Sequence, residues 1–146
     1  MRINVVEGGQ LTKNFKLSEF YCNDSAQMYV DGFFFYTFLP TLQQFREWYN
    51  RPININSGYR SAACNKRAGG SSNSAHLKAR AVDFNYPAEY FTFSEKRKEE
   101  LLQNVKKKWT SLCHKQGVFA QVNFYSNRFH LGMSETRDSF LDYRKK

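Results

Sequence analysis

Two stretches of the chain place hydrophobic residues at helical spacing. The first runs from residue 39 toward Pro52, and its apolar side consists of Leu42, Phe45, Trp48 and Tyr49. The second begins at a capping box formed by Thr92 and Glu95 and ends near Gly117. Its apolar side consists of Leu101, Leu102, Val105, Trp109 and Leu112. The sequence therefore predicts two amphipathic helices.

Alternation with a period of two residues predicts four strands. They cover 53–56, 81–85, 118–125 and 128–133, and the last two form a hairpin around 126–127. Asp83 lies on the polar side of its strand, and His130 on the polar side of the last strand. A helix, strand, helix, hairpin order predicts an α+β fold with a central antiparallel sheet and flanking helices.

The chain reads as one domain over its 146 residues, because no repeat or linker interrupts it. Residues 1–14 are expected to form an N-terminal arm and 134–146 a basic C-terminal tail. We expect a monomer. Three cysteines without CxxC spacing, at positions 22, 64 and 113, argue against a disulfide framework and against a thiolate zinc site.

Composition indicates a folded protein with an anionic partner. Hydrophobic residues make up 41% and aromatic residues 17%, and 22 Lys and Arg against 13 Asp and Glu give a net charge of +9. Nucleic acid, anionic membrane and cell-wall polymer all fit that charge. The longest uncharged aromatic run, 33–39, is far shorter than the roughly 20 residues that span a bilayer. Because 1–14 does not resemble a signal peptide, we expect synthesis in a cytoplasm.

Two of the three histidines and one aspartate form a candidate metal site. His76 precedes Asp83 by seven residues, and His130 follows on a different strand. Imidazole nitrogens and carboxylate oxygens bind zinc, and three protein ligands leave a fourth tetrahedral position for water, as in catalytic sites. Taken alone, residues so far apart in sequence are more often part of a core or a solvated surface than a zinc site.

Four segments resemble a known enzyme family. They are Asn-Ser-Gly-Tyr-Arg-Ser at 56–61, Asn-Lys to Gly-Gly at 65–70, Ser-Ala-His-Leu-Lys to Asp at 74–83, and Phe-His-Leu at 129–131. This pattern resembles the zinc D-Ala-D-Ala carboxypeptidases and L-alanyl-D-glutamate endopeptidases of the peptidase M15 type, which share a fold with the hedgehog signalling domain and include many phage endolysins. The resemblance runs from Phe15 to Met133, and 14–20 looks like the start of small phage-encoded members.

The resemblance implies a zinc peptidase that hydrolyses peptide bonds in bacterial peptidoglycan stem peptides. It implies a phage source, and that the protein reaches the wall after release from a host cytoplasm or within a virion. The residues that match family positions are His76, Asp83 and His130 as metal ligands, and Arg60, Ser74 and the adjacent Tyr59 for substrate binding. In this family role Arg60 also stabilises the oxyanion that forms on the peptide carbonyl.

Two positions depart from the family pattern. The family usually has Glu or Asp three residues before the last histidine as general base, but this chain has Asn127, whose amide cannot accept a proton. A missing base costs about 10²–10⁴-fold in rate. Glu135 could fold back to replace it, and Tyr125 could polarise a carbonyl. Ala79 stands where the family usually has glycine, and we expect it to need only an ordinary backbone angle.

Two other functions stay open at this point. Because of Asn127, the chain could be a catalytically impaired, zinc-containing module that binds the wall. The aromatic run 33–36 and the basic charge also suit a single-stranded nucleic-acid-binding protein, but contiguous rings favour core packing. His114 is expected to be a cation at a helix C-terminus, and Lys106–Lys108 a solvated face.

Overall fold

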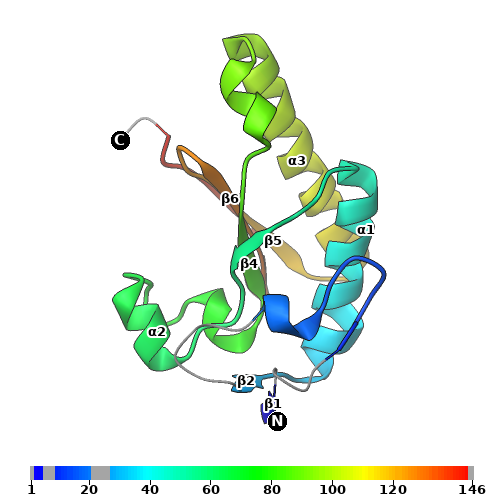
Figure 1. Cartoon of the computed structure of the whole chain (residues 1–146), viewed down its shortest axis with the longest axis vertical. Helices are drawn as coiled ribbons and strands as arrows, with labels where there is room; N and C mark the ends of the chain where they lie inside the picture. Colours follow the sequence, from blue (N-terminus) through cyan, green and yellow to red (C-terminus); the bar gives the residue numbers. More distant parts are fainter. Residues whose placement is uncertain (1, 5–8, 21–26, 145–146) are drawn as a thin grey trace.

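The computed structural model describes residues 2–4, 9–20 and 27–144. A five-stranded sheet lies at the centre of the fold (Figure 1). In spatial order its strands are β3 (Ile55–Ser57), β4 (Ala81–Asn85), β6 (Arg128–Ser134), β5 (Phe119–Phe124) and β7 (Ser139–Asp142). Neighbouring strands are antiparallel except β5 and β7, which run parallel. The predicted α+β class is therefore confirmed, but the sheet is mixed rather than antiparallel throughout.

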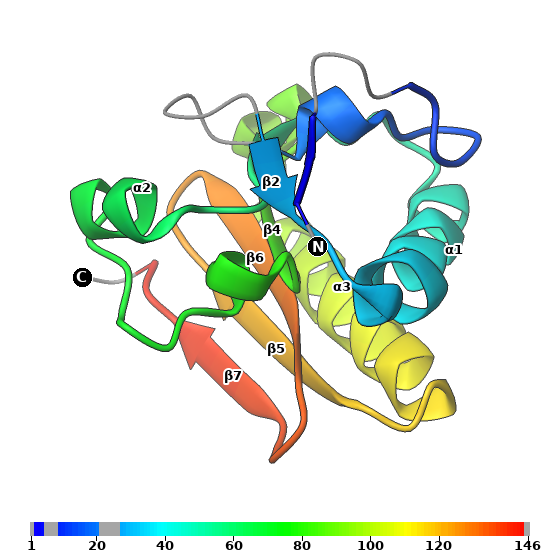
Figure 2. The ribbon, with the colours of Figure 1, turned by 90° about the horizontal axis from the view of Figure 1, so that it is seen from below.

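Two helices cover one face of this sheet, α1 (Leu39–Tyr49) and α3 (Glu95–Lys115) (Figures 1 and 2). On the other side lie α2 (Ala62–Arg67) and the short helix η3 (Ala75–Lys78), which contacts β4 and β6. The remaining elements are β1 (Arg2–Asn4), η1 (Leu17–Glu19), β2 (Gln27–Tyr29), η2 (Phe34–Phe38) and η4 (Ala88–Thr92). Within the described ranges, no helix is long and apolar enough to span a membrane.

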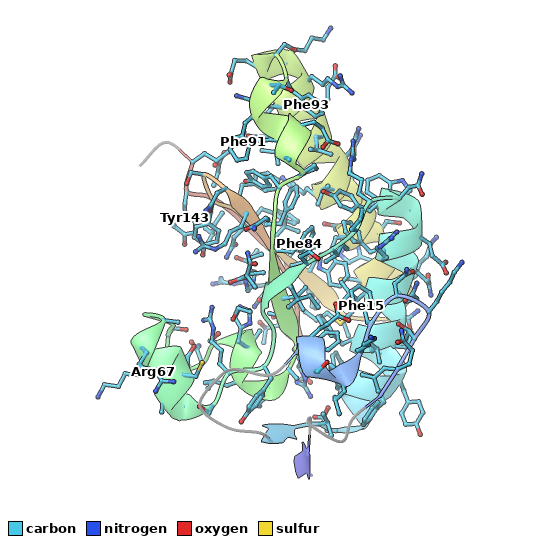
Figure 3. The ribbon with its side chains drawn as sticks, viewed as in Figure 1. Phe15, Arg67, Phe84, Phe91, Phe93 and Tyr143 are labelled. Atoms are coloured by element: carbon cyan, nitrogen blue, oxygen red, sulfur yellow. The ribbon has the colours of Figure 1, made fainter. Side chains whose placement is uncertain are left out.

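Aromatic side chains fill the space between the sheet and the two long helices (Figure 3). The ring of Phe45 contacts those of Phe84 and Trp109, at centroid distances of 6.2 and 5.9 Å. Phe34, in the aromatic run, is fully buried in this core, whereas Tyr36 is 82% exposed. Core packing thus accounts for Phe33, Phe34 and Phe35 of the run that suggested stacking on nucleic-acid bases, but not for Tyr36.

One end of each long helix, the C-terminus of α1 and the N-terminus of α3, is set by a residue that the sequence analysis did not select. Asn50 adopts a left-handed conformation (φ 53°) and donates its backbone N–H to Arg46, so α1 ends before Pro52. Ser94 caps α3 by accepting the backbone N–H of Arg97 at 3.2 Å. The predicted capping box at Thr92 is therefore wrong, because Thr92 ends η4 instead.

The predicted basic tail contributes a strand to the sheet. Asp138 precedes β7 and accepts the backbone N–H of Ala120 at 2.8 Å, and it lies 2.9 Å from Nε2 of His114. These contacts place β7 beside β5. The strand was missed because Phe140 and Leu141 are consecutive exposed hydrophobic residues, so the segment lacks alternation. His114, expected to act only as a helix-end cation, is paired with Asp138.

Ala79 adopts a left-handed backbone conformation, with φ 56° and ψ 43°, where it ends η3. The expectation of an ordinary backbone angle is therefore wrong. The turn needs this conformation because the backbone N–H of Ala79 lies against the carbonyl oxygens of Ala75 and His76.

Replacing Ala79 with glycine is expected to raise the free energy of unfolding by about 0.5–1 kcal/mol, because glycine adopts positive φ without the Cβ clash. The small loss of the buried methyl group limits the gain. Chemical denaturation of the two proteins measures the difference. A lower stability of the glycine variant would show that the methyl contacts outweigh the strain.

Candidate metal centre

Two strands and one short helix bring the three predicted ligands together. Asp83 of β4 and His130 of β6 are direct cross-strand partners, so their side chains share one face of the sheet. His76 reaches the same point from η3. One ligand atom from each residue lies within 4.8 Å of the others. The three side chains are 2%, 5% and 9% exposed, in chain order.

The ring of His76 is oriented for ligation through Nε2. Its Nδ1 lies 2.6 Å from the carbonyl oxygen of Gly58, which can only accept a hydrogen bond, so the proton is on Nδ1. Nε2 is buried, makes no hydrogen bond and lies 3.3 Å from Oδ1 of Asp83. A buried, unprotonated nitrogen beside a carboxylate is the arrangement that a metal ion would complete.

His130 is oriented for ligation through the other ring nitrogen. Its Nε2 lies 3.2 Å from Oε1 of Gln121, an acceptor, so the tautomer with its proton on Nε2 donates to Gln121 and leaves Nδ1 for a metal ion. Nδ1 lies 2.9 Å from Oδ1 of Asp83. Gly132 makes room for this support, because a Cβ there would lie 2.6 Å from Oε1 of Gln121. Gln121 is thus placed to orient the candidate ligand His130.

The protonation states of these residues suit a metal ion. Burial alone would raise the pKa of Asp83, but the neighbouring imidazoles of His130 and His76 outweigh burial and hold that pKa well below its usual range. Burial lowers the pKa of His130, although Asp83 opposes this shift. At neutral pH the site therefore offers a carboxylate and a neutral His130 imidazole, the forms that bind metal.

Arg60 ties the ligand Asp83 to the surrounding loops. Its Nη2 lies 3.3 Å from Oδ2 of Asp83, its Nε donates to Oγ of Ser57 at 2.8 Å, and its Nη1 lies 3.4 Å from Oδ1 of Asn65. The buried Asn65 in turn donates to the carbonyl of Ser71 at 2.7 Å. One guanidinium therefore holds the carboxylate oxygen of Asp83 that faces away from the histidines.

The three ligands open into a polar cavity of about 430 Å³. Its polar lining includes two residues from the loops before β4, Arg60 and Ser74. It also includes residues in or next to the strands β5, β6 and β7, which are Gln121, Asn123, Tyr125, Arg128 and Tyr143. Ser74 also caps η3 by accepting the backbone N–H of His76. Among the described residues that line this cavity, Asp83 is the single carboxylate.

Three predicted site residues lie elsewhere. Tyr59 is 3% exposed within the hydrophobic core and does not line the cavity. Asn127 lies in the turn before β6, where its side chain accepts from Arg128 at 3.4 Å. Glu135 is 70% exposed and pairs with Arg80 at 3.2 Å. The structure therefore places Tyr59 in the core and the two others outside the lining of the cavity, and the roles given to all three stay predictions.

The variant Asn127→Asp introduces an acid at the position where the family has its general base. We expect kcat/KM to change by less than about twofold, because residue 127 does not line the cavity. A general base must come within hydrogen-bond distance of the proton that it removes from the attacking water. Asn123→Asp is the matched comparison, since Asn123 lies directly across from His130 and lines the cavity. A rate increase of tenfold or more in Asn127→Asp would contradict the observed position of the turn.

The sequence analysis missed several lining residues, although a signal for some of them was present. Gln121 and Asn123 occupy the polar positions of the strand that pairs with the His130 strand, and the same alternation that selected His130 selects them. Arg128 shares the face of His130 two residues away. Tyr143 carried no signal, because it follows a strand that the pattern did not predict.

Comparison with known proteins places this site in a family. The family model for peptidase M15 matches residues 13–124, and the match includes His76 and Asp83 but ends before His130. The chain is also 40% identical over 42 residues to the zinc D-Ala-D-Ala carboxypeptidase of Streptomyces albus G, covering 29% of this chain and 16% of that protein. Because the family match ends before His130, this residue joins the candidate metal site through its position in the structure. The family match itself covers most of the chain. The chain belongs to the peptidase M15 family.

Proposed function

We propose that this protein is a zinc-dependent peptidase that hydrolyses a peptide bond in bacterial peptidoglycan stem peptides. The observation that carries the proposal is the cluster of His76, Asp83 and His130 in the wall of a polar cavity. Family membership supports peptidase chemistry, and similarity to a zinc D-Ala-D-Ala carboxypeptidase supports the metal and the substrate class. The protein spans only a small part of that relative, so the substrate is part of the proposal.

In the proposed reaction a zinc ion would activate water and the substrate carbonyl, and side chains of the protein would bind the substrate. Nε2 of His76, Nδ1 of His130 and a carboxylate oxygen of Asp83 would hold zinc, which when bound polarises a carbonyl and lowers the pKa of water to about 7. Arg60 has donors left over from its three contacts and lines the cavity, so it can hold a substrate oxygen. Burial and the nearby Asp83 raise the pKa of Tyr125, so its hydroxyl stays protonated and can donate to a substrate.

A second candidate function follows from the missing carboxylate. Because the described lining residues include no acid besides the ligand Asp83, no carboxylate base is in place to accept a proton. This observation favours a zinc-containing module that binds wall peptides and cleaves them slowly or not at all. The phage source and the route to the wall stay predictions.

Digestion of purified muropeptides, followed by mass spectrometry, tests the proposal. We expect the zinc-loaded protein to release D-Ala or to split the stem peptide at one bond, and the mass change identifies that bond. A chelator should stop the cleavage and added zinc should restore it. Wall binding with no cleavage over long incubation would establish the second candidate, and neither binding nor cleavage would remove both.

A further inference from the structure

We propose that Arg128 binds a free carboxylate on the substrate residue that follows the scissile bond, and so determines specificity. This inference rests on the proposed peptidase function. Arg128 lines the same cavity as the metal ligands and begins the strand that carries His130. It is not one of the three candidate metal ligands.

The guanidinium of Arg128 is held in place without being neutralised. It lies over the ring of Tyr125, 4.0 Å from the centroid, and its other contact is with the neutral amide of Asn127. Within the described parts of the chain, no carboxylate forms an ion pair with it. A cation fixed on an aromatic face keeps its N–H donors available for a planar anion such as a carboxylate.

The charge of the cavity also favours an anionic substrate. Its charged lining residues are Arg60, Arg128 and Asp83. Arg60 pairs with Asp83 at 3.3 Å, so the positive charge of Arg128 is not balanced by a carboxylate in the lining of the cavity. A bound divalent cation would increase that excess. In a partly enclosed site, such a charge attracts a substrate anion and disfavours a neutral analogue.

The spacing fits a carboxylate close to the scissile bond. Arg128 and His130 share one strand face two residues apart, so their Cα atoms are separated by roughly 7 Å along the strand. In an extended peptide, successive carbonyl carbons lie about 3.5 Å apart. A long arginine side chain starting at residue 128 can therefore reach the α-carboxylate of the next substrate residue while the scissile carbonyl lies near the ligands.

The C-terminal strand supports this arrangement. Tyr143 stacks on Tyr125 with ring centroids 5.0 Å apart and lies on the side of the sheet away from α1 (Figure 3). Its backbone N–H donates to Phe124 at 2.7 Å, and the next residue, Arg144, pairs with Asp142 and with Glu99 of α3. Tyr143 is therefore a positioning residue, which acts on Arg128 through the ring of Tyr125.

The test compares two peptides that differ in one group. After the muropeptide digest identifies the cleaved bond, a stem peptide with a free α-carboxylate on the following residue is compared with the same peptide carrying an amide there. We expect the native enzyme to prefer the acid. In Arg128→Gln, kcat/KM for the acid should fall about 10–100-fold, mainly through KM, while the amide changes less than about twofold. Arg128→Lys should restore part of the preference, and Tyr143→Ala should weaken it.

Arg97→Gln is the matched control, because its guanidinium also lies 4.0 Å from an aromatic centroid, that of Phe93, outside this cavity. It should leave the preference unchanged. Equal cleavage of acid and amide by the native enzyme, or an equal loss of both in Arg128→Gln, overturns the assignment while the peptidase function stands. If the muropeptide digest shows no cleaved bond, the peptidase function is overturned, and the assignment with it.

Discussion

Replacing His76 with alanine is expected to lower zinc affinity by more than about 100-fold and to abolish hydrolysis. Loss of a mere supporting hydrogen bond around a metal ligand costs about 10–100-fold in affinity, and this change removes the ligand itself. The carbonyl of Gly58 also loses its 2.6 Å partner. Metal content after dialysis and competition with a chromophoric chelator measure the affinity, and muropeptide digestion measures the activity.

His114→Ala is the control for this experiment. His114 is an exposed histidine on α3 that pairs with Asp138, and it does not line the cavity of the ligands. Its replacement should leave the metal content unchanged, because His114 is not part of the candidate metal cluster. Circular dichroism of both metal-free variants separates loss of metal from loss of fold. Full zinc content in a folded His76→Ala protein would disprove the ligand assignment.

The parts of the fold that could be predicted are those in which a repeating pattern meets a core. The strand 81–85 has the predicted bounds because Val82 and Phe84 are buried while Asp83 faces the site. The first strand is shifted to Ile55–Ser57, because a three-residue strand offers too little alternation to locate its ends. The parallel pairing of β7 with β5 depends on Asp138, a contact between distant segments that no local pattern records.

The sequence brought the three candidate ligands to attention, but it did not show how the groups around them support them. Residue type and spacing alone did not separate the candidate ligands from core or surface residues, and the family resemblance selected them. The cross-strand pairing of Asp83 with His130 follows from two correctly predicted strands. The support of His130 by Gln121 depends instead on the space left by Gly132. The position of the general base was identified from the family pattern as residue 127. In the structure, however, Asn127 lies in a turn and does not line the cavity.

Replacing Arg60 with glutamine is expected to lower kcat/KM by about 10²–10³-fold, the effect of losing a donor aimed at a developing oxyanion. The change also leaves Oδ2 of the 5% exposed Asp83 without its cation. Breaking a buried pair in this way should destabilise the metal-free protein by about 3 kcal/mol. Steady-state hydrolysis and chemical denaturation, each with and without zinc, separate the two effects.

Two variants make the Arg60 result specific. Arg60→Lys should recover little, because a lysine ammonium cannot contact Ser57, Asn65 and Asp83 at once as the planar guanidinium does. Arg51→Gln breaks an arginine–carboxylate pair of similar length, 3.2 Å to Glu89, but at the surface, so activity and stability should hardly change. If Arg60→Gln also kept its activity and stability, Arg60 would be neither an oxyanion donor nor the support of Asp83, and its contacts in the site would be incidental.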